Sequence, residues 1–144
     1  MALIDGPPAV ESLLPHGDPM RLVRVIVEAT VPQSLACIAV IPPDNPLAEG
    51  DAAPAFVGLE AAAQAAAALE ALSRRHDSTA GPRLGYLVGV RDATFHSSFL
   101  PVGEPLSVRV EAAGSAPPLA VYEARIELGG TLLVSGTLST YVVA

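Results

Sequence analysis

Two polar side chains, Glu60 and Gln64, stand in a stretch of otherwise small and apolar residues. They are four residues apart, so on an α-helix they would share a face, with Cβ atoms roughly 5–6 Å apart. A carboxylate among Ala, Leu, Val and Gly would be desolvated, which favours its protonated form and prepares a general acid. The alternative is that Glu60 caps a backbone group or pairs with an arginine such as Arg21 or Arg24.

A long helix is predicted over Ala55–Arg75 to hold this pair. Alanine, which dominates the segment, has the highest intrinsic helix propensity. Pro54 suits the first turn, and Arg74 and Arg75 complement the negative end of the helix dipole. The surface of the helix is apolar nearly all round, which is typical of a helix enclosed by other elements.

Strands are predicted on both sides of the helix, from strand-like apolar runs before it and from apolar residues that recur at a period of two after it. Two of these runs precede the helix and four follow it: Arg21–Ala29, Ser34–Ile41, Leu84–Phe95, Pro105–Glu111, Leu119–Leu128 and Thr131–Val143. This order predicts an α+β protein in which a curved antiparallel β-sheet wraps around one long central helix. We expect residues 1–144 to form a single domain.

Composition excludes several classes of protein. The chain is 51% apolar and 16% charged, which excludes a disordered chain. Its net charge is −7 and all eight basic residues are Arg, so nucleic-acid binding is not expected. The lone Cys37 excludes a disulfide within the chain and is predicted to be a buried thiol. The N-terminus has no basic n-region, so a cytoplasmic protein is expected.

No membrane span and no metal site are expected. The apolar stretch 53–72 contains a carboxylate near its middle, which is costly inside a bilayer, and its polar interruptions are Glu60, Gln64 and Glu70. None of the three histidines, His16, His76 and His96, has metal-ligand spacing. His76 follows two arginines at the end of the predicted helix, where it would complement the dipole.

Several segments, taken together and in order, resemble motifs of the 3-hydroxyacyl-ACP dehydratases. The closer likeness is to the divergent branch found in aryl-polyene pigment clusters, and it extends over most of the chain from Leu13 to Val110. The segments that carry it are Leu14–His16 with Pro19 and Val25, Pro54–Ala65, Gly85–Phe95 and Pro101–Leu106. The resemblance implies the hot-dog fold and a homodimer, possibly a higher oligomer.

The resemblance also implies a reaction, in which water is eliminated from a 3-hydroxyacyl thioester held in a tunnel between two subunits. The substrate would be carried on the phosphopantetheine of acyl carrier protein (ACP) or CoA, with no other cofactor. Glu60 falls on the family's acid and Gln64 on its helix glutamine. The backbone amide at Ala55 would polarise the thioester carbonyl, with Phe56 beside it in the substrate site.

The family's catalytic histidine does not carry over, because Pro46 occupies the corresponding position. His16, which lies inside a matched motif, is therefore predicted as the catalytic base. His96 is the second candidate and a predicted substrate-binding residue. Proton abstraction contributes typically 10²–10⁴-fold to such reactions, so the identity of this base matters.

Two alternatives stay open. One is a hot-dog acyl thioesterase in which Glu60 orients water. The other is a non-catalytic acyl-binding protein or partner subunit of a true dehydratase, which the proline at position 46 favours. An ACP partner is acidic, so it would need a local basic patch, for which the candidates are Arg21, Arg24, Arg83 and Arg91.

Overall fold

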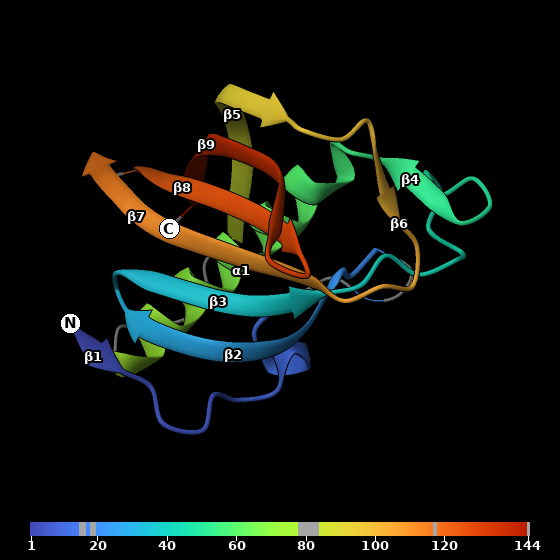
Figure 1. Cartoon of the computed structure of the whole chain (residues 1–144). Helices are drawn as coiled ribbons and strands as arrows, with labels where there is room; N and C mark the ends of the chain where they lie inside the picture. The colour runs from blue at the N-terminus through green and yellow to red at the C-terminus, as the bar shows by residue number, and fades with distance from the viewer. Residues whose placement is uncertain (15–16, 18–19, 78–83, 117, 144) are drawn as a thin grey trace.

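The computed structural model describes residues 1–14, 17, 20–77, 84–116 and 118–143. One long helix, α1 (Val57–His76), lies against a curved seven-stranded sheet whose neighbouring strands are all antiparallel. Figure 1 shows the sheet in front of the helix. The strands, in sheet order, are β1 (Ala2–Leu3), β2 (Val23–Val31), β3 (Ser34–Ala39), β7 (Leu106–Ala116), β8 (Leu119–Leu128), β9 (Thr131–Val143) and β5 (Leu84–Phe95).

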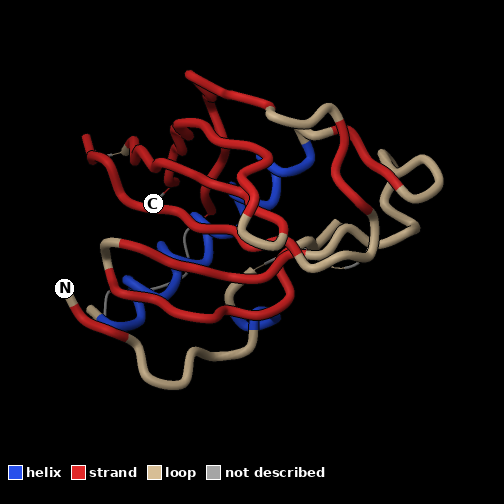
Figure 2. Tube along the Cα trace, viewed as in Figure 1, coloured by secondary structure: helices blue, strands red, loops and turns tan. Residues whose placement is uncertain are grey.

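Two smaller features flank this unit. A two-stranded sheet of β4 (Ala52–Pro54) and β6 (Phe99–Pro101) lies beyond the N-terminal end of α1. A 3-10 turn, η1 (Val10–Ser12), precedes β2. Figure 2 shows α1 as the one long helix behind the strands. The α+β class and the curved antiparallel sheet around one helix, both predicted from the sequence, are confirmed.

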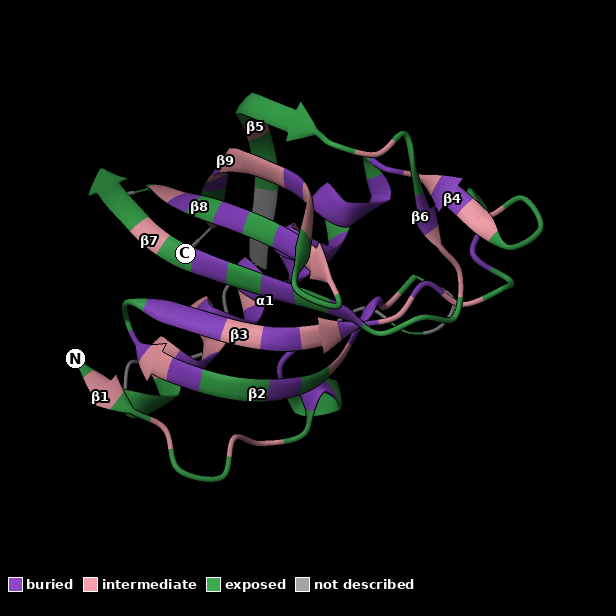
Figure 3. Ribbon diagram, in the orientation of Figure 1, coloured by how far each residue is buried: buried purple, intermediate pink, exposed green. Residues whose placement is uncertain are grey.

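Alternation along the strands separates a buried face from an exposed one. In β7, Leu106, Val108 and Val110 are buried, whereas the residues between them are exposed (Figure 3). The buried face packs on α1, which contacts β2, β3, β7, β8 and β9. Burial of apolar side chains between helix and sheet is the main favourable term in folding.

Small residues on α1 let the helix approach the sheet closely. A Cβ added at Gly58 would lie 3.2 Å from Leu100 Cδ1 and 3.5 Å from Val134 Cγ2. Buried alanines follow along the helix, and Leu69 and Leu72 are buried towards its C-terminal end.

The bounds of β5, β8 and β9 match the predicted ones, and β7 runs beyond the predicted end at Glu111 through a bulge to Ala116. The predicted start of the helix is wrong by two residues. Pro54 belongs to β4, and the backbone N–H of Ala55 donates to the Ser98 carbonyl, so the helix begins only at Val57. None of the described helices is long and apolar enough to cross a membrane.

Candidate functional site

Glu60 lies on the side of α1 that the sheet does not cover. The prediction that this carboxylate is desolvated is wrong for the single subunit, because Glu60 is exposed. Its stripe of the helix continues through half-buried Ala63, Ala67 and Ala71, so α1 is enclosed on the sheet side only. Within the described part of the chain, Glu60 has neither the backbone nor the arginine partner considered above.

Gln64, one turn further along α1, is buried and engaged with the backbone. Its Oε1 accepts the N–H groups of Leu22 at 2.8 Å and of Val23 at 3.2 Å. Its Nε2 donates to the Met20 carbonyl at 2.8 Å. Gln64 therefore ties the entry of β2 to the helix, and its amide oxygen has no acceptor site left for a ligand.

The N-terminal turn of α1 presents amides, although not the one expected from the sequence. The Ala55 N–H donates to the Ser98 carbonyl at 3.0 Å and so cannot polarise a substrate carbonyl as predicted. The next two N–H groups, of Phe56 and Val57, have no backbone acceptor among the described residues. Donors at a helix N-terminus attract developing negative charge.

Phenylalanines lie on the three segments that meet near this end of the helix. All three phenylalanines of the chain are exposed: Phe56 by 52%, Phe95 by 45% and Phe99 by 60%. Phe56 is one turn from Glu60, so the two share a helix face. Phe99 pairs with Pro54 in the small sheet. Of the three, only Phe56 was predicted as a site residue. The exposure of Phe95 and Phe99 has no signal in the sequence, because phenylalanine in an apolar chain is normally expected in the core.

Only one of the predicted histidines can be placed beside this end. His96 is exposed, and its backbone N–H donates to the Leu133 carbonyl. It lies two residues before Ser98, whose carbonyl accepts the backbone N–H of Ala55. His16 lies outside the described residues. His76 ends α1, sixteen residues from Glu60, which corresponds to about 24 Å of helix.

The loop that carries Pro46 is ordered by hydrogen bonds of its own. Buried Asn45 accepts the Leu47 N–H through Oδ1 at 3.0 Å, and Pro46 beside it is exposed. The position that the family resemblance assigns to a base thus holds a side chain without an acid or base group.

The arginines considered for a carrier patch have different surroundings. Arg21 pairs with Glu11 at 3.2 Å and is mostly buried, with its Nε lacking a hydrogen-bond partner. Arg24 is half-buried and Arg91 is exposed on β5. Arg83 lies outside the described residues.

Cys37 is buried in the core, as predicted, and burial raises the pKa of its thiol to about 12. The thiolate is the nucleophilic form of cysteine, so this side chain is unsuited to covalent catalysis near neutral pH. The carboxylate of Glu60, the amides of Phe56 and Val57 and the imidazole of His96 are the groups that this end of α1 offers for chemistry.

Comparison with known proteins gives concordant results. The family model of the ApeP-like dehydratases, described as ApeP dehydratase, matches residues 8–144. A 3-hydroxyacyl-[acyl-carrier-protein] dehydratase FabZ from Anaeromyxobacter dehalogenans is 34% identical over 107 residues, which are 71% of this chain and 67% of that protein.

Solved structures agree with this result. A chain of the dehydratase heterocomplex ApeI:P from Xenorhabdus doucetiae superposes with a TM-score of 0.85 at 25% identity, covering 95% of this chain and 92% of that one. A mutant thioesterase from Pseudomonas aeruginosa has a TM-score of 0.60 at 15% identity, covering 84% of this chain and 81% of that one. The latter likeness concerns the fold alone.

Proposed function

This chain belongs to the ApeP-like dehydratase family, and from that membership we propose that it acts in the elimination of water from 3-hydroxyacyl thioesters carried on ACP. One observation in particular supports this function. The exposed carboxylate of Glu60 lies one helical turn from the open N–H groups at Phe56 and Val57. A general acid and a carbonyl-polarising pair are two of the three groups that this elimination needs, and the third is a base.

The chemistry assigns a role to each group. The amides of Phe56 and Val57 donate hydrogen bonds to the thioester oxygen and stabilise the negative charge that develops there when a base removes the proton next to the carbonyl. The bond from C3 to the hydroxyl then breaks, Glu60 gives its proton to the departing hydroxyl, and water and a 2-enoyl thioester result. Among the described histidines, His96 is the candidate base, and the assignment of His16 stays a prediction.

A second subunit would complete this site. The outer edge of β5, at the end of the sheet, has no neighbouring strand in the described chain, and an unpaired edge favours pairing with another chain. Leu87, Val88 and Val90 of this strand are 39%, 57% and 40% exposed. Pairing of two subunits along β5 would exclude water from the end of α1 and leave an apolar channel for the acyl chain, as we propose for a homodimer.

A second candidate function is that of the subunit that supports a catalytic partner. Pro46 in place of a histidine favours it, as does the likeness to a chain of a dehydratase heterocomplex. In that case the partner supplies the base, and this chain supplies Glu60 and the helix amides.

Turnover of a 3-hydroxyacyl-ACP distinguishes the two candidates. The purified chain is incubated with the substrate, alone and after co-expression with a histidine-bearing hot-dog dehydratase, and the enoyl product is detected by mass spectrometry. Product from the chain alone supports the first function, and product from the pair but from neither protein alone supports the second. Release of free acid and thiol would instead identify a thioesterase, and no product in either arm would contradict both proposals.

A further inference from the structure

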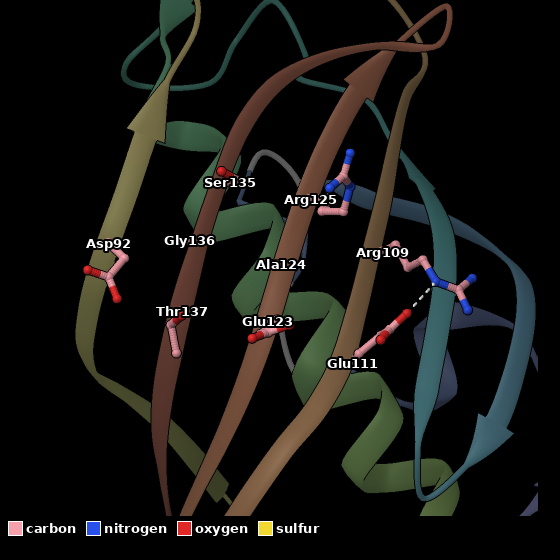
Figure 4. A pocket seen from close by; sticks show the side chains of 9 residues that line it. All are labelled: Asp92, Arg109, Glu111, Glu123, Ala124, Arg125, Ser135, Gly136 and Thr137. Atoms are coloured by element: carbon pink, nitrogen blue, oxygen red, sulfur yellow. Dashed lines mark hydrogen bonds and ion pairs between the residues drawn. The ribbon is translucent and has the colours of Figure 1, made fainter.

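The face of the sheet turned away from α1 carries two rows of charge. Arg109 on β7 lies directly opposite Arg125 on β8, and these form the arginine row. Two residues along each strand, Glu111 lies directly opposite Glu123, and these form the glutamate row. Figure 4 shows all four side chains on the side of the sheet away from the helix.

This pairing is unfavourable for a sheet that faces only water. Like charges directly opposite one another on neighbouring strands destabilise a sheet, whereas opposite charges stabilise it. The ion pairs run along the strands instead, between Arg109 and Glu111 at 3.1 Å and between Arg125 and Glu127 at 3.5 Å. Exposed pairs of this kind contribute little, and Glu123 has no ion-pair partner among the described residues.

The surroundings of the two rows resemble a binding surface. An open hollow of about 430 Å³ lies beside them, lined also by Ser135 and Thr137 of β9 and by Asp92 of β5. A second hollow of about 260 Å³ lies on the other side, next to Val27 and Ile38. Val25 and Val27 of β2 are 52% and 60% exposed on this part of the sheet. Protein interfaces combine apolar area with polar groups, and arginine is among the residue types enriched in them.

We propose that this face binds the same face of a second copy of the chain. The two rows are two residues apart along the strands, which is about 7 Å. A two-fold axis across the strands, midway between the rows and over the Val110–Ala124 pair, exchanges them. Each arginine row then faces the glutamate row of the other copy, and the like-charge pairs within each sheet gain opposite charges across the interface.

The pattern favours a second copy over other partners. An acidic partner would be attracted by the arginine row but repelled by the glutamate row. A basic partner would be attracted by the glutamate row and repelled by the arginine row. Only a surface with the same alternating rows satisfies both. The face lies on the opposite side of the sheet from α1, so this association leaves Glu60 open and does not depend on the proposed function.

Charge exchange tests the proposal. The double variant Arg109→Glu/Arg125→Glu makes both rows acidic, and Glu111→Arg/Glu123→Arg makes both rows basic. At low ionic strength, we expect the wild-type chain to sediment at twice the mass of either variant alone. An equimolar mixture of the two variants should recover the wild-type mass, because an all-acidic face then meets an all-basic one. Salt of about 1 M, with a Debye length of about 3 Å, should weaken both assemblies.

The control variant Glu49→Arg/Glu104→Arg changes the net charge as much as Glu111→Arg/Glu123→Arg does, at exposed positions in loops. It should keep the wild-type mass. Circular dichroism shows whether each variant is folded, and recovery in the mixture itself requires folded variants. The proposal is overturned if the acidic variant keeps the wild-type mass, or if the folded variants do not associate when mixed. Binding of an acidic carrier protein at this face, with no change in self-association, would also overturn it.

Discussion

The side-chain oxygen of Gln64 accepts the backbone N–H of Leu22 at 2.8 Å, joining the middle of α1 to the segment that enters β2. The two residues are 42 positions apart in the sequence. Because Gln64 is 1% exposed, bulk solvent does not compete for this hydrogen bond in the folded chain. Gln64 therefore has a structural role, whereas the role proposed for the exposed Glu60 is chemical.

Replacement of this glutamine should cost stability. Gln64→Leu keeps the volume but leaves the N–H groups of Leu22 and Val23 and the Met20 carbonyl without their partner. The two N–H groups are buried and each costs about 1–3 kcal/mol when unpaired, so we expect a loss of about 2–6 kcal/mol in urea unfolding. Glu60→Gln, at an exposed position one turn away, should change stability by less than about 0.5 kcal/mol. Equal midpoints for the two variants would refute the anchoring role.

The contact at Gly58 should be sensitive to side-chain size. Gly58→Ala places a methyl group 3.2 Å from the movable end of Leu100, and the gain of about 1 kcal/mol in helix propensity offsets the crowding. Gly58→Val adds branches towards Val134 and Ile126, which leave no room, and should cost about 1–3 kcal/mol. Gly114→Ala, with open space around it, is the control for thermal unfolding. A valine variant as stable as the alanine variant would show that the helix is less closely packed.

Stability should fall at alkaline pH. Burial raises the pKa of Cys37 from 9.0 to about 12, and burial followed by the charge of Glu70 raises the pKa of Tyr122 from 10.0 to about 12. Above pH 9 the unfolded chain loses these protons while the folded chain keeps them, so unfolding becomes more favourable as the pH rises towards 12. For each group, the folding constant falls up to tenfold per pH unit.

Two variants identify the groups responsible. Cys37→Ala should flatten the dependence of unfolding free energy on pH from about 9 upwards, and Tyr122→Phe should flatten it from about 10. Chemical denaturation at several pH values measures both slopes. If both variants keep the wild-type slope, other groups cause the alkaline loss.

The edge of β5 should decide whether subunits pair. Val88→Lys places a charge on the exposed strand, and lysine at an edge opposes strand pairing. We expect this variant to lose both pairing along β5 and dehydration, with little change in unfolding of the subunit. Leu3→Lys, on the short edge strand β1, is the matched control and should retain both. A fully active Val88→Lys variant would exclude β5 as the edge that completes the site.

Much of the fold could be predicted because its signals are local. Period-two alternation gave the bounds of β5 and β8, and alanine content gave the long helix. The three-residue strands β4 and β6 escaped prediction, since Pro54 and Pro101 lack the N–H that a strand normally offers.

The site was less predictable because its determinants join distant parts of the chain. Glu60 and Gln64 have the same spacing on any helix, but only the position of the sheet decides that one is exposed and the other buried. The Ala55 amide was assigned to a substrate, whereas the fold brings the Ser98 carbonyl to it from the β5–β6 connection. The amides of Phe56 and Val57 take that role in the proposed site.

The most direct test of the account is the rate of 2-enoyl product formation from a 3-hydroxyacyl-ACP by wild-type and Glu60→Gln proteins, each assayed alone and with the co-expressed dehydratase partner. The glutamine variant should keep the wild-type assembly and unfolding midpoint while its rate falls by at least about 100-fold, as loss of a general acid requires. A Glu60→Gln rate equal to that of the wild type, in whichever assembly is active, would contradict the role of Glu60.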